Sequence, residues 1–183
     1  EQAKEIFLIF QKKMKDPDVT EVTQEHIDRA ETFKTFKQGV PFRIGDMKIT
    51  PIRTDHSAFD SYMFLIEANG KRILHTGDFR THGPFGKGVF KMLKIVGKVD
   101  VLICEHTTLS RQDTTVMTEF ELQREAVDII KNNKYIFIMC TSTNIDRISS
   151  FYHANKRAGE KLFICDNYQK EVLDYVSKSS AKY

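Results

Sequence analysis

A two-residue turn, Asn69-Gly70, separates two runs that each have the length and composition of a β-strand. The runs cover residues 62–68 and 71–76. An Asn-Gly pair between such runs is a strong signal for a β-hairpin, because both residues readily adopt the positive φ angles that the tight turn needs. The chain is therefore predicted to contain antiparallel sheet in its first half.

The segments before this hairpin extend the same prediction. Residues 40–52 alternate between apolar and polar side chains around Gly45-Asp46, which indicates a second hairpin. Residues 1–38 have helical apolar spacing and lack strand alternation. We predict a helical lead-in over residues 1–38 and a mainly antiparallel sheet over residues 40–80.

The pattern changes after Gly97 to strand, loop, helix, strand and helix. Short, continuous apolar runs of this kind, separated by helices, are typical of strands buried on both faces of a parallel sheet. A capping box at residues 118–121 opens one of the helices, and a second helix begins near Asn144. The runs cover residues 99–103, 135–139 and 162–164, and we predict a strand over each. Each run is followed directly by a cysteine, namely Cys104, Cys140 and Cys165.

These patterns predict an α/β fold in two parts. Residues 1–112 form an α+β sandwich portion that contains the antiparallel sheet. Residues 113–183 form a parallel α/β portion, in which the order βαβα favours right-handed crossovers. The boundary between the two parts is predicted near residue 112.

Composition limits the classes of protein that remain. The 183 residues are 40% hydrophobic and 29% charged, so a packed core can form. No window approaches 18 consecutive apolar residues, which excludes a membrane span. The three cysteines form no Cys-x-x-Cys pair, and each lies at the end of an apolar run. They are therefore expected to be small apolar residues in a reducing compartment, which favours a cytoplasmic protein. The chain begins with Glu1 and has no secretory signal pattern, so we expect a cut or processed start.

The basic residues are distributed unevenly. The net charge is only +3, but residues 71–98 hold seven Lys or Arg and a single acid, Asp78. Such a stretch can attract a polyanion, or it can be a solvated lysine face.

Two turns place metal-binding side chains directly after strands. His56 follows the strand that ends near Arg53, and Asp78 follows the strand that ends near Thr76. They are 22 residues apart with a complete hairpin between them, so both can emerge at one edge of the sheet. Imidazole and carboxylate groups are ligands for Zn²⁺ or Mn²⁺. The alternative is that Asp78 caps a turn and His56 is an ordinary loop residue.

Two further features lie at predicted strand ends. Glu105 follows Cys104, at an edge where α/β proteins collect functional groups. The turn over residues 141–144 precedes a helix, and free N–H groups at a helix N-terminus can hold a phosphate oxygen. The same residues are also ordinary helix caps.

Together these segments resemble the β-CASP branch of the metallo-β-lactamase superfamily, the nucleases that include ribonuclease J and the pre-mRNA cleavage endonuclease. Asp55-His56-Ser57 is similar to the family's third motif, whose histidine is a metal ligand. His75-Thr76-Gly77-Asp78-Phe79-Arg80 resembles the fourth, whose aspartate bridges two metal ions. Residues 102–108 are similar to the acidic motif at which the inserted β-CASP domain begins, and residues 140–147 resemble a strand–helix junction inside it.

The resemblance implies a partial metallo-β-lactamase domain over residues 1–112 and the first part of a β-CASP domain over residues 113–183. The family's His-x-His-x-Asp-His motif and its later histidine motifs have no counterpart in the chain. We therefore expect a middle piece of a longer protein. Its apolar edges would be covered by absent segments or by self-association as a homodimer.

The parent implied by the resemblance is a metal-dependent phosphodiesterase that cleaves RNA, with single-stranded RNA as the expected partner, through water activated by two divalent ions, zinc or manganese. His56 would ligate one ion and Asp78 would bridge both. Glu105 would be a catalytic carboxylate nearby that either supports the metal ligands or handles protons. Two ligands do not complete a four-coordinate zinc site. We therefore expect no stoichiometric zinc on this chain alone.

The candidate contacts to RNA phosphates are the basic stretch over residues 71–98, which includes Arg80, and the turn that holds Thr141, Ser142 and Asn144. Two other functions remain open. One is a metallo-β-lactamase-fold hydrolase that acts on a small ester or thioester. The other is a non-catalytic RNA-binding homologue that keeps the fold and has lost metal ligands.

Overall fold

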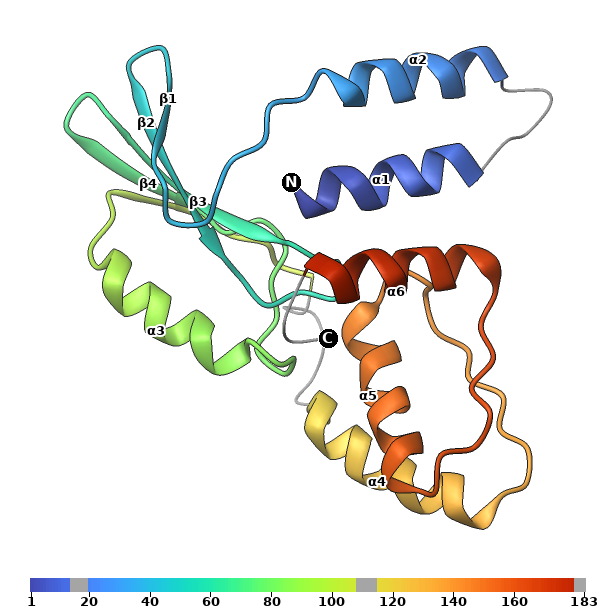
Figure 1. Ribbon diagram of the computed structural model, residues 1–183. Helices are drawn as coiled ribbons and strands as arrows, with labels where there is room; N and C mark the ends of the chain where they lie inside the picture. The colour runs from blue at the N-terminus through green and yellow to red at the C-terminus, as the bar shows by residue number, and fades with distance from the viewer. Residues whose placement is uncertain (14–19, 108–114, 180–183) are drawn as a thin grey trace.

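The computed structural model describes residues 1–13, 20–107 and 115–179, which form a mixed α/β structure with a five-stranded sheet and six helices (Figure 1). The predicted α/β class is confirmed at this level. None of the helices in these ranges is long and apolar enough to cross a membrane.

The sheet has the strand order β1-β2-β3-β4-β5. Its strands are β1 (Phe42–Ile44), β2 (Met47–Arg53), β3 (Tyr62–Ala68), β4 (Lys71–His75) and β5 (Val101–Ile103). Neighbours from β1 to β4 are antiparallel, whereas β5 is parallel to β4. Both predicted hairpins are confirmed. Asn69 and Gly70 have φ angles of 50° and 70°, as a type I′ turn requires.

Strand direction brings three loops to one edge of the sheet. β2 and β4 are each antiparallel to β3, and β5 is parallel to β4, so these three strands run the same way. We call the edge where they end the carboxyl edge. The loops that leave it carry His56, Asp78 and Glu105, as expected from the hairpin between the first two.

Helix α3 (Gly86–Val96) covers one face of the sheet (Figure 1). The sequence patterns do not predict this helix, because Gly86 and Gly88 lie in its first turn and glycine is unfavourable in helices. Its apolar side packs on β2, β3 and β4. The buried residues of this core are Ile52, Met63, Leu65, Leu74, Val89 and Val96.

The first helix packs between the second helix and the last one. α1 (Gln2–Lys13) contacts both α2 (Thr20–Glu31) and α6 (Asn167–Ser179), as Figure 1 also shows. Val172 and Val176 of α6 are buried against the α1 side chains. Packing between α1 and α6 therefore crosses the boundary that we predict near residue 112.

Helices α4 (Glu119–Asn132) and α5 (Ile145–Arg157) pack on each other through Ala126, Ile130 and Ala154. The predicted capping box is confirmed, since the Thr118 side chain accepts the N–H of Glu121 and the Glu121 carboxylate accepts the N–H of Thr118.

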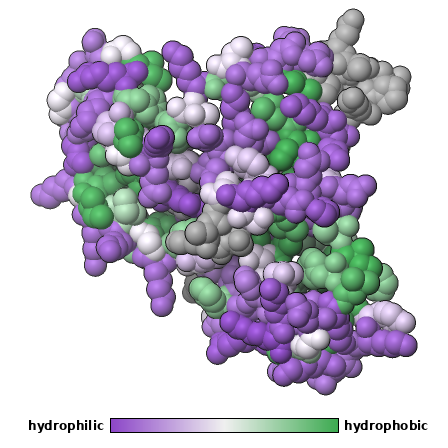
Figure 2. All heavy atoms as spheres, viewed as in Figure 1, coloured by the Kyte–Doolittle hydropathy of each residue, from purple (hydrophilic) through white to green (hydrophobic). Residues whose placement is uncertain are grey.

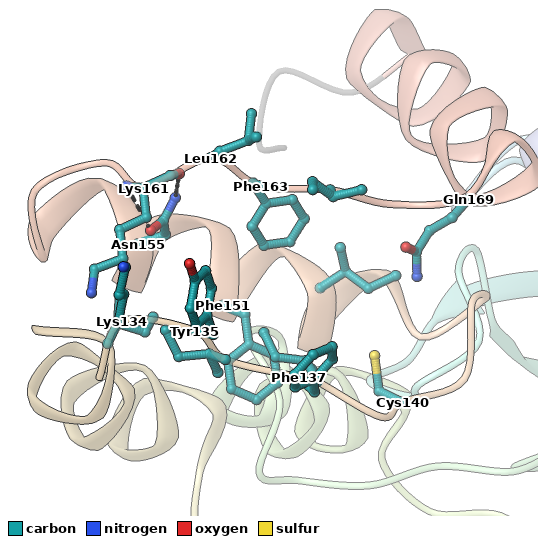
Figure 3. Close-up of a pocket in the computed structure, with 15 residues that line it drawn as sticks. Lys134, Tyr135, Phe137, Cys140, Phe151, Asn155, Lys161, Leu162, Phe163 and Gln169 are labelled. Atoms are coloured by element: carbon teal, nitrogen blue, oxygen red, sulfur yellow. Dashed lines mark hydrogen bonds between the residues drawn. The ribbon is translucent and has the colours of Figure 1, made fainter. Parts of the chain in front are cut away.

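Two predicted strands, over residues 135–139 and 162–164, are wrong. The structure assigns neither segment to a strand. Both line an apolar cavity of about 520 Å³ (Figure 3), and Phe137 is 99% exposed. A continuous apolar run favours a strand only where a neighbouring strand supplies hydrogen bonds. Figure 2 shows a hydrophobic surface at lower right, over this part of the chain.

The prediction of burial on both faces is also wrong for β5. Val101, Leu102 and Ile103 are 47%, 58% and 47% exposed. β5 is the last strand of the sheet, so it has one hydrogen-bonded neighbour. The three cysteines that follow the apolar runs are free thiols; Cys104 is exposed, and Cys140 and Cys165 are half-buried.

Candidate functional site

The turn after β2 is built around a buried carboxylate. Asp55 is fully buried and accepts the backbone N–H groups of Gly83 at 2.8 Å and Phe85 at 3.4 Å. A Cβ at Gly83 would lie 2.3 Å from Oδ1 of Asp55, so this approach requires glycine. The next residue, His56, is half-buried, and its Nδ1 accepts the N–H of Ala58 at 3.1 Å.

The turn after β4 presents Asp78. The N–H of the buried Thr76 donates to the Ile103 carbonyl at 2.9 Å, which ties the turn to β5. Gly77 has φ of 55°, and a Cβ there would lie 3.1 Å from the Tyr62 carbonyl oxygen. Glycine therefore allows the sharp turn that leaves Asp78 exposed at the carboxyl edge.

A main-chain hydrogen bond joins these two turns. The N–H of Arg80 donates to the carbonyl oxygen of Asp55 at 2.7 Å. His56 directly follows Asp55, and Asp78 precedes Arg80 by two residues. The structure therefore brings the backbones that carry His56 and Asp78 together.

Glu105 is tied to the same turn. Its carboxylate accepts the N–H of Phe79 at 3.0 Å and the hydroxyl of Thr107. These hydrogen bonds, that from Thr107 above all, hold the pKa of Glu105 below its ordinary value. The side chain is thus an ionised carboxylate at neutral pH, which suits a residue that positions the Asp78 turn better than one that donates a proton.

The Thr141–Asn144 turn also lies at this edge. Asn144 forms an isolated antiparallel bridge with Ala58. Ala58 lies two residues after His56 in the sequence. The Asn144 Oδ1 accepts the N–H of Arg147 at 3.2 Å, so Asn144 is the N-cap of α5. Thr141 is exposed and Ser142 is half-buried. Capping is therefore observed for Asn144, and a phosphate contact by this turn stays a prediction.

The predicted contact between Arg80 and RNA does not agree with the structure. The Arg80 side chain is 10% exposed, and its guanidinium lies among carboxylates, where it pairs most closely with Asp146. It also faces Asp55, 3.7 Å from Nε, and Glu119, 3.6 Å from Nη1. A guanidinium committed to buried carboxylates is unavailable to a phosphate in solution.

The sequence patterns missed this ionic cluster. Glu119 is buried, and its carboxylate also accepts the Arg147 guanidinium at 3.0–3.1 Å and the Ser150 hydroxyl at 3.1 Å. Its N–H donates to the His82 carbonyl at 3.0 Å. In the sequence, Glu119 looks like an ordinary acid in the first turn of a helix. The one pattern that points to the ionic cluster is Asp55, an acidic residue directly before the candidate ligand His56.

Within the described residues, no group of three or more His, Cys, Asp or Glu side chains is arranged to hold a metal ion. The Ala58 N–H donates a hydrogen bond to Nδ1 of His56. A neutral His56 that accepts at Nδ1 carries its proton on Nε2. Nε2 can therefore ligate a cation only after this hydrogen bond is broken and the proton leaves Nε2. The residues that the structure describes therefore do not by themselves fit a complete zinc or manganese centre.

Three of the seven basic residues in the stretch over residues 71–98 lie on α3. Lys87, Lys91 and Lys94 have the i, i+4, i+7 spacing that places side chains along one helix face, and all three are exposed. Phe90, on the same helix, is 58% exposed. α3 begins directly after the Gly83–Phe85 segment that binds Asp55, so the lysine face starts close to the candidate site.

Comparison with known proteins gives a distant likeness to a ribonuclease. The chain is 25% identical over 146 residues to Ribonuclease J of Sinorhizobium meliloti, covering 76% of this chain and 26% of the relative. It is 24% identical over 147 residues to Ribonuclease J of Helicobacter pylori, covering 78% of this chain and 21% of the relative. The chain resembles Ribonuclease J. It spans about a quarter of the length of these curated relatives, and no family model matches it.

A solved structure shares the fold. The crystal structure of a protein of unknown function from Enterococcus faecalis V583 superposes with a TM-score of 0.67 and 17% identity, over 77% of this chain and 34% of that one. At this identity the likeness concerns the fold alone. The resemblance to Ribonuclease J predicted from the motifs is thus supported by weak homology over three-quarters of the chain.

Proposed function

We propose that the chain is a segment of a hydrolytic nuclease of the β-CASP metallo-β-lactamase type that acts on RNA. The likeness to Ribonuclease J over 146 residues carries this proposal. It gains support from the carboxyl edge, where the loops of His56 and Asp78 leave parallel-running strands and are joined by a main-chain hydrogen bond.

In this proposal the chain contributes part of a metal centre. His56 and Asp78 are two of the ligands, and the others come from elsewhere in the full-length protein. Zinc or manganese held there would supply Lewis-acid chemistry. Glu105 fixes the backbone beside Asp78 through the Phe79 N–H. His56 would have to give up its hydrogen bond with the Ala58 N–H before it could hold such an ion.

The substrate proposed is single-stranded RNA, and a cytoplasmic location belongs to the same proposal. The exposed lysines of α3 and the turn over residues 141–144 are the candidate contacts to its phosphates. The lysines are favoured because they are solvated point charges beside the carboxyl edge, in contrast to the buried Arg80.

The deciding experiment compares two exposed aspartates in the full-length protein. Asp78→Ala is expected to reduce hydrolysis of a single-stranded RNA by at least about a hundredfold and to lower the metal content, as loss of a bridging ligand should. Asp46→Ala is the matched control, because Asp46 lies in the exposed β1–β2 turn, outside the candidate site. The control should keep wild-type activity and metal.

Two results would contradict the proposal. An Asp78→Ala protein with unchanged RNA hydrolysis and metal content would remove Asp78 from the site. A full-length wild-type protein that binds RNA without cleaving it would favour the non-catalytic homologue instead.

A further inference from the structure

Arg80 lies where three separate segments of the chain meet. Its side chain is 10% exposed, and the nitrogens of its planar guanidinium face different directions. Each nitrogen has a different carboxylate neighbour: Asp55 after β2, Glu119 at the start of α4, and Asp146 at the start of α5. A single side chain therefore connects the sheet to both helices.

The backbone of Arg80 adds a fourth connection. Its N–H donates to the Asp55 carbonyl oxygen at 2.7 Å. Asp55 belongs to the His56 turn and Arg80 belongs to the Asp78 turn, so this hydrogen bond joins the two turns. The bridge between Ala58 and Asn144 then joins the His56 turn to the start of α5. The turns thus form a closed ring of contacts in which Arg80 is the shared member.

The other charges of the cluster have additional partners. Glu119 retains Arg147 and Ser150 as hydrogen-bond donors, and Asp55 retains the N–H groups of Gly83 and Phe85. Without the Arg80 guanidinium, these two carboxylates therefore still have hydrogen-bond donors. The segments that carry them should keep their local structure and lose the connection to one another.

We propose that Arg80 is a positioning residue that fixes the His56 turn, the Asp78 turn and the start of α5 relative to one another. Its importance for catalysis rests on the proposed nuclease function, whereas the connection itself does not. Arginine is required, because a planar guanidinium can face several carboxylates at once and a lysine ammonium is a single point charge on a flexible stem.

Hydrogen exchange on the full-length protein, in the absence of RNA and metal, tests this connection. In Arg80→Met and in Arg80→Lys, amide exchange is expected to accelerate by about tenfold or more in residues 55–58, 77–83 and 144–147. Rates in β3 and α6 should stay within about twofold of wild type. Arg43→Met is the matched control, since Arg43 is exposed on β1 and its side chain donates to the carbonyl of Asp46 in the same turn.

Two exchange results would overturn the proposal. In one, Arg80→Lys restores wild-type rates in all three segments, so that positive charge alone suffices. In the other, both variants accelerate exchange equally throughout the chain, which means that Arg80 supports global stability and has no local positioning role. The lysine variant keeps the test decisive if Arg80→Met fails to fold.

Kinetics of the full-length protein provide a separate readout. A positioning role predicts that Arg80→Lys lowers kcat for RNA hydrolysis while KM and its salt dependence stay unchanged. A higher KM with a weaker salt dependence would show that Arg80 contacts RNA phosphates, which contradicts the proposal. If the wild-type protein cleaves no RNA, the nuclease function fails, and hydrogen exchange alone still decides the role of Arg80.

Discussion

The backbone N–H of Phe79 donates to Oε1 of Glu105 at 3.0 Å, and this bond joins the loops that leave β4 and β5. The two strands are parallel neighbours, so their loops leave the sheet side by side. Phe79 directly follows Asp78. The Glu105 carboxylate therefore determines where the Asp78 backbone sits, although Phe79 and Glu105 are 26 residues apart in sequence.

This relationship predicts a pH-dependent loop. Hydrogen bonds lower the pKa of Glu105, so ionised Glu105 contributes stability that is present above its unfolded pKa of about 4.3 and is lost as the pH falls through the lower folded value. The amide proton shift of Phe79, followed by NMR on acidification, should titrate with a midpoint below about 4.3.

Substitution of Glu105 tests whether this carboxylate causes the titration of the Phe79 amide. Glu105→Gln cannot ionise, so the Phe79 amide should lose this titration. Glu125→Gln, on the exposed side of α4, should leave it unchanged. A midpoint above the ordinary glutamate range, or a titration that survives in Glu105→Gln, would contradict the role given to Glu105.

Two glycines of α3 predict opposite effects of the same substitution. A Cβ at the buried Gly86 would lie 1.9 Å from the Thr81 carbonyl oxygen, whereas a Cβ at Gly88 would meet nothing within 4 Å. Gly86→Ala should lower the free energy of unfolding by about 1–3 kcal/mol because the backbone must move. Gly88→Ala should raise it by about 0.5–1 kcal/mol because alanine favours the helix.

Urea denaturation of the two variants measures both changes. Each variant is the control for the other, since the glycines are two residues apart on one helix. Equal destabilisation by both substitutions would show that α3 does not begin with Gly86 packed against the Thr81 carbonyl.

Local interactions explain what the sequence predicts correctly. The Asn69-Gly70 hairpin and the capping box at Thr118 depend on residues next to each other, so their patterns are visible in a single sequence. The common edge of His56 and Asp78 follows from the same logic, because one hairpin between two strands makes them run the same way.

Long-range contacts explain what the sequence does not predict. The strand signals at residues 135–139 and 162–164 describe composition, but a strand also needs a neighbour, and the described chain provides none. Arg80 matches a motif next to Asp78, which suggested a phosphate contact. Its actual partner Asp146 is 66 residues away in sequence, and no local pattern reports such a pair.

The cap of α4 predicts a stability change at the edge of the ionic cluster. The Thr118 side chain accepts the N–H of Glu121 at 3.2 Å, and Glu119 lies between them. Thr118→Ala should lower the free energy of unfolding by about 1 kcal/mol, as loss of an N-cap does. Thr115→Ala, an exposed neighbour outside the helix, should change it by less than about 0.5 kcal/mol. Equal effects would argue against the capping box.

The lysine face of α3 predicts how the proposed RNA interaction depends on salt. Replacement of Lys87, Lys91 and Lys94 by glutamine should weaken binding of single-stranded RNA by the full-length protein, independently of RNA sequence. Each phosphate contact contributes about 0.7 to the slope of log K against log salt concentration for a single strand, so the slope should fall by about 2. The control replaces three exposed lysines distant in sequence from α3, namely Lys34, Lys131 and Lys178. Counterion release requires phosphates close to the charge, so a smaller slope in the α3 variant alone would locate the RNA on this helix, and an equal fall in both variants would exclude it as the RNA track.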